Sequence, residues 1–187
     1  MRIGLDVDGV MYQFHRTACY MLRTMKGYPD TLRVENWTSW NWIKDNVSKE
    51  DWRWLWSEGV ELGLFRHGHL HQGTIEAVRE LSLRGDVVII TQRRPNLMQD
   101  TLDWLSYHKF PINELHLLHE DEAKSSVPHC DYYVDDKPDN VIDLRDNTKA
   151  AMVFLWQRPW NKGFVWPGVR IVKTWEGMIG QIDRTYG

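Results

Sequence analysis

The sequence predicts an α/β fold in which a mainly parallel sheet carries helices on both faces. Short apolar runs such as Val87–Ile90 alternate along the chain with segments of helical periodicity, and this order is typical of strand–helix–strand units. Acidic residues or a threonine follow several of these runs directly. A tryptophan-rich stretch of helical pattern follows the first run, which indicates a small helical insert.

The elements can be justified in order from local signals. Residues 2–7 form the first expected strand, which stops at Asp8-Gly9 because this pair favours a tight turn. Apolar spacing predicts a helix over 14–26, and Ser48 begins a capping box for the next helix. The further expected elements are helices over 74–84, 95–105 and 138–144 and strands over 87–90, 115–118, 132–134 and 152–155.

Composition and charge exclude several classes of protein. The 187 residues can bury one core, and 23 basic against 26 acidic residues give a net charge of −3 without a basic run, so duplex nucleic acid is not an expected partner. Apolar stretches are far shorter than the roughly 20 residues of a membrane span, and Asp6 precedes any signal-peptide core. We therefore expect a cytoplasmic protein, whose two cysteines are reduced thiols.

Polar residues recur where the apolar runs stop. Asp6 and Asp8 follow the first run, Thr91 follows a second, and Asp135 with Asp136 follow a later one. Each alone is ordinary turn chemistry, but the carboxyl ends of parallel strands meet at one edge, so these side chains are expected in one crevice. Several carboxylates in one cleft repel each other unless a cation neutralises them, and oxygen ligands indicate Mg²⁺. The sequence therefore predicts a metal and a phosphate at this edge.

Four ordered motifs resemble those of the haloacid dehalogenase superfamily of phosphotransferases. They are Asp6-Val7-Asp8-Gly9-Val10, Ile89-Ile90-Thr91, Lys124 and Val134-Asp135-Asp136. The resemblance implies a Rossmann-like core with a cap inserted after the first strand. A response-regulator receiver also combines acidic residues with threonine and lysine, but its acidic pair comes first and its phosphorylated aspartate follows a middle strand, so this chain resembles it poorly.

The resemblance also implies roles for the motif residues. Asp6 would be the nucleophile that forms an acyl phosphate, and Asp8 would be the general acid and base. Thr91, the backbone amide of Gln92 beside it and Lys124 would hold the phosphate oxygens. A solvated lysine before a Ser-Ser turn is the ordinary alternative for Lys124, but its position ahead of the acidic pair favours the functional role.

Mg²⁺ would be bound by the acidic residues of the first and last motifs. By resemblance it bridges the Asp6 carboxylate, the carbonyl of Asp8, one member of the acidic pair and the phosphate. Asp135 is the expected direct ligand. Asp136 would act through water or fix Lys124.

Further positions resemble the 5′(3′)-deoxyribonucleotidase and cytosolic type C 5′-nucleotidase family. They are Phe14, Phe65, His69-Leu70-His71-Gln72-Gly73, Pro159-Trp160-Asn161 and Trp175. Members of that family dephosphorylate small nucleoside monophosphates, and cap aromatics stack on the base, as Phe14 and Phe65 would here. The resemblance implies a core of residues 1–13 and 72–187, a cap of residues 14–71, and a homodimer as in many relatives.

The chain departs from this family where relatives carry Thr-Ser-Pro and it has Thr91-Gln92-Arg93-Arg94. Arg93 or Arg94 either reaches a sugar hydroxyl or second phosphate, or is solvated at a helix entrance, which is the more frequent case. In the insert, Trp52, Leu55 and Trp56 share one helix face and are expected to pack in the interior, whereas Trp54 lies roughly opposite Trp52. Trp54 is therefore exposed or turned to the cleft, and it is a candidate for substrate binding.

Three functions remain open on the sequence. The first is a Mg²⁺-dependent phosphatase for nucleoside monophosphates, and the second is the same chemistry on a sugar phosphate or a nucleic-acid end. The third is a non-catalytic nucleotide-binding protein, against which the complete motif set speaks. The alternating His67, His69 and His71 lack a fourth zinc ligand, and we interpret them as a loop.

Overall fold

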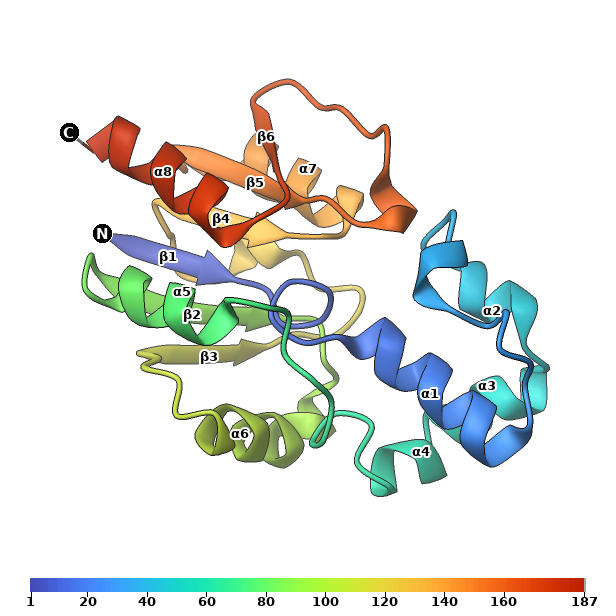
Figure 1. Ribbon diagram of the computed structural model, residues 1–187. Coiled ribbons are helices and arrows are strands. Elements are labelled where there is room, and N and C mark those ends of the chain that lie inside the picture. The colour runs from blue at the N-terminus through green and yellow to red at the C-terminus, as the bar shows by residue number, and fades with distance from the viewer. Residues whose placement is uncertain (187) are drawn as a thin grey trace.

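The computed structural model describes residues 1–186 and contains a six-stranded sheet whose neighbouring strands all run parallel (Figure 1). The strands lie in the order β3-β2-β1-β4-β5-β6. Their bounds are β1 (Arg2–Leu5), β2 (Asp86–Thr91), β3 (Glu114–Leu117), β4 (Tyr132–Asp135), β5 (Met152–Trp156) and β6 (Val169–Val172). The predicted fold class is thereby confirmed.

Helices cover both faces of the sheet. In β2, Val87 and Ile89 belong to one apolar cluster and Val88 and Ile90 to another, because successive strand side chains point to opposite faces. The first cluster includes side chains of α5, α6 and α8, and the second includes side chains of α7. The bounds are α5 (Thr74–Ser82), α6 (Met98–Tyr107), α7 (Pro138–Asn147) and α8 (Trp175–Tyr186).

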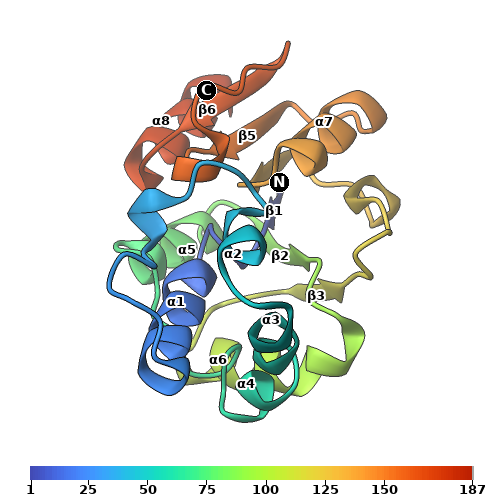
Figure 2. The same ribbon diagram turned by 90° about the vertical axis from the view of Figure 1, so that its right-hand side faces the viewer.

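A helical segment between β1 and α5 lies beyond the carboxyl ends of the strands (Figures 1 and 2). Its helices are α1 (Phe14–Lys26), α2 (Trp42–Asn46), α3 (Lys49–Leu55) and α4 (Glu58–Glu61). The predicted cap of α3 is present, because Ser48 Oγ accepts a hydrogen bond from the Asp51 amide at 3.0 Å. Trp37, Leu55 and Leu64 are fully buried within this segment, so part of the tryptophan excess fills its interior.

Two late elements carry weak sequence signals and were not among the expected ones. β6 is short and exposes Arg170 and Ile171, so it lacks a clear apolar pattern. In α8, Gly177 and Gly180 interrupt the helical pattern, and glycine lowers helix propensity. Cys19 and Cys130 are buried free thiols. Among residues 1–186, no helix has the length and apolar character needed to cross a membrane.

Candidate active site

The carboxyl ends of β1 and β4 form the centre of the site. Successive strands β1, β2 and β3 extend the sheet in one direction, whereas β4 returns to the other side of β1. In open parallel sheets, ligands bind at such a reversal because the flanking loops diverge and leave a crevice. Leu5 pairs with Val134, so the residues that follow, Asp6 and Asp135, are both carried into this crevice.

Three buried carboxylates meet there. Oxygen atoms of Asp6, Asp135 and Asp136 all lie within 4.8 Å of one another. Burial raises the pKa of Asp6 to about 7, although Lys124 opposes the rise, and burial with the neighbouring carboxylates raises the pKa of Asp136 well above its usual range. This approach requires Gly9: its φ is 89°, and a Cβ there would lie 2.1 Å from an Asp136 oxygen.

A buried lysine compensates part of this charge. Lys124 Nζ donates hydrogen bonds to Asp6 Oδ1 and to Asp135 Oδ2, each at 2.5 Å, and to the carbonyl of Ile90 at 2.8 Å. Burial lowers the pKa of Lys124, but the two carboxylates outweigh it and hold the pKa above its ordinary value. Of the two roles expected for Asp136, the contact with Lys124 is made instead by Asp135, and action through water stays a prediction.

The carboxylate cluster fits a hard divalent cation. All its donors are oxygens, which Mg²⁺ prefers, and three buried carboxylates with one lysine resist ionisation unless a further cation joins them. Outer partners orient two of them: Trp160 Nε1 donates to Asp136 at 3.0 Å, and Asn140 Nδ2 donates to Asp135 at 3.1 Å. The side chain of Asp8 does not join this cluster, which leaves only its carbonyl for the predicted ligand role.

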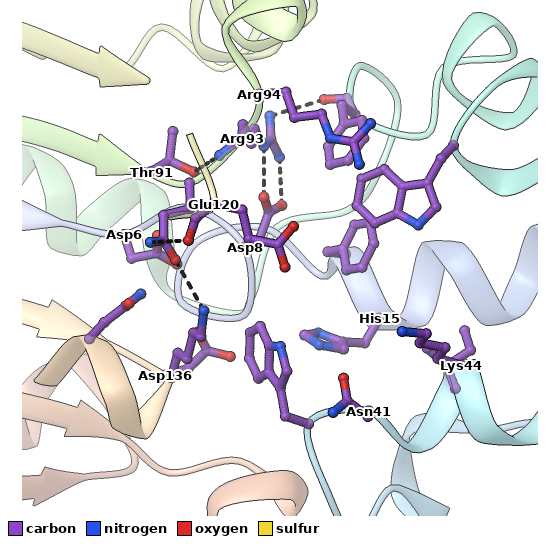
Figure 3. Close-up of a pocket in the computed structure, with 18 of the residues that line it drawn as sticks. Asp6, Asp8, His15, Asn41, Lys44, Thr91, Arg93, Arg94, Glu120 and Asp136 are labelled. Atoms are coloured by element: carbon purple, nitrogen blue, oxygen red, sulfur yellow. Dashed lines mark hydrogen bonds and ion pairs between the residues drawn. The ribbon is translucent and has the colours of Figure 1, made fainter. Parts of the chain in front are cut away.

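The remaining motif residues lie around the same crevice. Asp8 faces it, and its carboxylate is paired with Arg93 through contacts of 2.8 and 2.9 Å (Figure 3). Thr91 ends β2, is buried, and accepts a hydrogen bond from the Arg93 amide at 3.3 Å. Gln92 lines the cavity, and its side-chain amide donates to the carbonyl of Glu120 at 3.2 Å. The strand ends thus bring all four motifs together.

A cavity of about 500 Å³ opens next to these carboxylates. Its lining includes the motif carboxylates and Thr91, together with aromatic side chains of the helical segment. We call Phe14, Trp56 and Phe65 the aromatic wall. Phe14 stacks on Phe65 with ring centroids 5.4 Å apart, and the Trp56 ring lies 5.8 and 5.7 Å from them. The cavity is therefore lined both by acidic groups and by an apolar, planar surface.

Comparison with known proteins identifies the family. Residues 1–182 match the family described as 5′ nucleotidase, deoxy (pyrimidine), cytosolic type C protein. The chain belongs to this family. It is accordingly a phosphoric monoester hydrolase, in agreement with the sequence-based prediction of an enzyme.

Relatives of this nucleotidase-family chain include two bacterial proteins whose names describe them as nucleotidases by prediction. One is from Halalkalibacterium halodurans and is 24% identical over 164 residues, which cover 86% of this chain and 82% of the relative. The other is from Oceanobacillus iheyensis and is 24% identical over 163 residues, covering 82% of this chain and 85% of the relative. The alignments span both the helical segment and the sheet.

Solved structures of the haloacid dehalogenase type share the fold of this nucleotidase-family chain. A haloacid dehalogenase-like hydrolase from Streptococcus pneumoniae superposes with a TM-score of 0.64 at 15% identity and covers 97% of both chains. The L-2-haloacid dehalogenase from Xanthobacter autotrophicus has a TM-score of 0.60 at 9% identity and covers 98% of both chains. At such identities, the likeness concerns the fold alone.

Trp54 in α3 and Trp56 at its C-terminal end are placed differently from the expectation. Trp54 is 9% exposed, does not line the cavity, and packs with the Lys26 ammonium 4.3 Å from its ring centroid. Trp52 and Trp56 share a face, as the helical phase predicts, but this face meets the cavity. Helical phase tells which residues lie together, and it does not tell which face meets a ligand.

Several residues of the nucleotidase cavity were missed in the sequence. His15 stacks on Trp160 with centroids 3.8 Å apart, and Lys44 approaches from α2 (Figure 3). Asn140, which bonds Asp135, follows shortly after a proline that begins a helix beside the acidic pair, and this position was an available signal. Lys44 has no such signal, because it is an exposed lysine on a five-residue helix and belongs to none of the motifs.

Proposed function

We propose that this nucleotidase-family protein is a Mg²⁺-dependent phosphatase that hydrolyses (deoxy)nucleoside 5′- or 3′-monophosphates through a phospho-Asp6 intermediate. The observation that carries the proposal is the position of Asp6, beside two buried carboxylates and Lys124, in a cavity that the aromatic wall also lines. Within this proposal, residues 14–71 act as a cap over a core of residues 1–13 and 72–187.

The residues of this chain would divide the hydrolysis into two displacements. An Asp6 oxygen attacks phosphorus, the bond from phosphorus to the ester oxygen breaks, and Asp8 gives its proton to the leaving alkoxide. Asp8 then takes a proton from water as the water oxygen attacks phosphorus, and the Asp6 carboxylate leaves with release of phosphate. Thr91, the amide of Gln92 and Lys124 would hold phosphate oxygens throughout.

A divalent cation would be held by Asp6, Asp135 and Asp136 with the carbonyl of Asp8. When bound, it supplies positive charge that neutralises the phosphate oxygens and the buried carboxylates. Lys124 supplies a second positive charge, because its ammonium donates to Asp6 Oδ1. This contact favours the ionised form of Asp6, which a nucleophile requires, against the burial that raises the pKa.

The aromatic wall supports a substrate that carries a planar base. Phe14 and Phe65 lie nearly parallel, with 15° between their planes, and stacking of a base on aromatic rings contributes about 1–3 kcal/mol. The wall lines the same cavity as the carboxylates, and the cavity volume of about 500 Å³ is within the range of small-molecule sites. A nucleoside monophosphate would place its phosphate beside the carboxylates and its base against the wall.

The proposal is tested by phosphate release from ribo- and deoxyribonucleoside monophosphates and from sugar phosphates, each with Mg²⁺ and with excess chelator. We expect Mg²⁺-dependent turnover of nucleotides that Asp6→Asn abolishes. The phospho-Asp6 intermediate can be trapped by rapid quenching followed by reduction with tritiated borohydride, which converts an aspartyl phosphate into labelled homoserine. The label should be found at position 6 only when both substrate and Mg²⁺ were present. Turnover confined to sugar phosphates would overturn the nucleotide assignment, and full activity in Asp6→Asn would overturn the mechanism.

A further inference from the structure

Arg93 is a buried cation in the wall between the sheet and the helical segment. Its side chain is 0% exposed, so the solvated role that is common at a helix entrance is wrong for this residue. Three aromatic rings surround the guanidinium: its central carbon lies 4.7 Å from the Tyr12 ring centroid, 4.9 Å from Phe65 and 5.7 Å from Trp104. These contacts fix the plane of the group and replace water around the charge.

The hydrogen bonds of Arg93 are directed mainly at Asp8. Nε donates to Oδ2 at 2.9 Å and Nη2 donates to Oδ1 at 2.8 Å, so both carboxylate oxygens are engaged (Figure 3). The third nitrogen, Nη1, donates to the carbonyl of Phe65 at 3.4 Å and to Thr101 Oγ1 at 3.3 Å. A guanidinium bound through all three nitrogens has one orientation, and a carboxylate bound at both oxygens has one as well.

We propose that Arg93 is a positioning residue that fixes the Asp8 carboxylate toward the leaving group. The inference rests on the proposed function, in which Asp8 transfers the proton. Asp8 is partly open to the cavity, with 22% of its side chain exposed, so packing alone does not hold it. A positioned acid or base contributes about 10²- to 10⁴-fold to rate, and a carboxylate free to rotate loses much of that factor.

The same arginine connects Asp8 to the aromatic wall. The Phe65 carbonyl accepts a hydrogen bond from Nη1, and the Phe65 ring packs on the guanidinium. The same ring also stacks on Phe14 within the aromatic wall. A base bound against the wall and a leaving oxygen beside Asp8 would therefore be positioned relative to one rigid group. Lysine cannot replace this arrangement, because an ammonium group does not form the parallel pair of bonds.

The test compares two substrates that differ in their need for an acid. A nucleoside 5′-monophosphate has an alkoxide leaving group that must be protonated, whereas p-nitrophenolate leaves without a proton. For Arg93→Met, we expect kcat/KM for the nucleotide to fall about 100-fold and kcat/KM for p-nitrophenyl phosphate to fall less than about fivefold. Equal losses on both substrates would overturn the inference.

A double-mutant cycle separates positioning from structural damage. If Arg93 acts through Asp8, the double variant Asp8→Asn/Arg93→Met should be no slower on the nucleotide than Asp8→Asn alone, whereas independent damage would multiply the losses. Arg2→Met is the matched control, because Arg2 forms a similar two-bond pair with Glu114 at 2.7 and 2.9 Å away from the cavity. It should leave kcat/KM unchanged for both substrates.

Two further outcomes complete the design. If Arg93→Met does not fold, Arg93→Lys provides the same comparison, since it retains the charge and loses the paired bonds, and the selective loss on the nucleotide should persist. A wild-type chain without nucleotide turnover, or an Asp8→Asn variant with full turnover, would overturn the proposed function itself. Loss in Asp8→Asn together with unchanged nucleotide turnover in Arg93→Met would overturn the positioning role alone.

Discussion

Trp160 donates a hydrogen bond from its indole Nε1 to Asp136 Oδ2 at 3.0 Å. This bond ties the turn Pro159–Asn161 after β5 to the buried carboxylate cluster. Asn161 strengthens the connection, because its side-chain amide donates to the carbonyl of Asp136 at 2.7 Å and to the carbonyl of Trp156 at 2.8 Å. Asp136 is therefore oriented by a segment that comes after it in the chain.

We predict that Trp160→Phe lowers the affinity of the site for Mg²⁺ while leaving the fold intact. Phenylalanine retains an aromatic ring to stack on His15 but leaves Asp136 without its donor, and loss of an outer partner typically lowers metal affinity about 10- to 100-fold. The measurement is the Mg²⁺ concentration for half-maximal phosphatase activity. It should rise by that factor, with a much smaller change in the rate at saturating Mg²⁺.

The matched control for this variant is Trp166→Phe. Trp166 also points its indole nitrogen at an aspartate, with 3.5 Å to Asp146, but it is 36% exposed and lies outside the cavity. Its substitution should leave the Mg²⁺ dependence unchanged. An equal shift in both variants, or no shift in Trp160→Phe, would contradict a role for the indole in orienting Asp136.

Lys124→Met should destabilise the protein most when divalent cations are removed. The lysine is the buried counter-ion of Asp6 and Asp135, and removal of one partner of a buried ion pair costs about 3–5 kcal/mol. We expect this loss in the free energy of unfolding, measured by denaturant titration at pH 8 in chelator. Added Mg²⁺ should restore more stability to the variant than to the wild type, because the cation replaces the missing charge.

The control for Lys124→Met is Lys173→Met on the exposed surface. It should unfold like the wild type with and without Mg²⁺. The loss in Lys124→Met should also be smaller at pH 5 than at pH 8, since the unpaired carboxyls take up protons in the folded state. A wild-type unfolding curve for Lys124→Met in chelator would exclude the lysine as the counter-ion.

The sheet and the strand-end carboxylates were predictable because they depend on local patterns. Residues 87–90 are all apolar and β-branched, which is the composition typical of a strand that is buried on both faces. Asp6 and Asp135 then follow from strand parallelism, since carboxyl ends meet at one edge. The metal-binding role assigned to these residues stays a prediction, which the proximity of the carboxylates supports.

The burial of Arg93 was not predictable from its neighbours in the sequence. The rings that enclose it come from Tyr12, Phe65 and Trp104, which lie in three distant parts of the chain. No local pattern contains that information. The placement of Trp54 and Trp56 failed for a related reason, since the orientation of α3 relative to the sheet decides which face of the helix meets the cavity.

Stability should fall below neutral pH because of neutral histidines that folding removes from water, of which the half-buried His71 is the clearest test. Burial, assisted by Arg158 and Arg16, lowers the pKa of His71 to about 3. The unfolded chain binds this proton near pH 6.5 and the folded chain does not, so stability is complete above 6.5 and is lost as the pH falls. One such group removes about 2 kcal/mol of stability by pH 5.

His71→Leu should therefore flatten the pH dependence of unfolding between pH 7.5 and 5. The Nε2 atom of His71 is buried without a hydrogen-bond partner among the described residues, so leucine removes no bond at that atom. The free energy of unfolding, measured by denaturant titration across this range, should decline less than in the wild type by about 2 kcal/mol. His129→Leu, at an exposed position, should keep the wild-type slope, and an unchanged slope in His71→Leu would contradict the prediction.

Trp56 and Trp54 provide a paired test of the aromatic wall. Trp56 lines the cavity with its ring 5.7 Å from Phe65, whereas Trp54 is buried outside it. Since base stacking contributes about 1–3 kcal/mol, Trp56→Leu should lower the ratio of kcat/KM for a nucleoside monophosphate to kcat/KM for ribose 5-phosphate by about 5- to 150-fold.

Trp54→Leu should lower the melting temperature through lost packing and leave that ratio unchanged, because both substrates would lose the same fraction of folded enzyme. The ratio thus separates contact with the base from a contribution to the interior of the helical segment. A change in the ratio for Trp54→Leu together with none for Trp56→Leu would restore the placement that helical phase alone suggests, and it would require α3 to turn its other face to the substrate when the nucleotide binds.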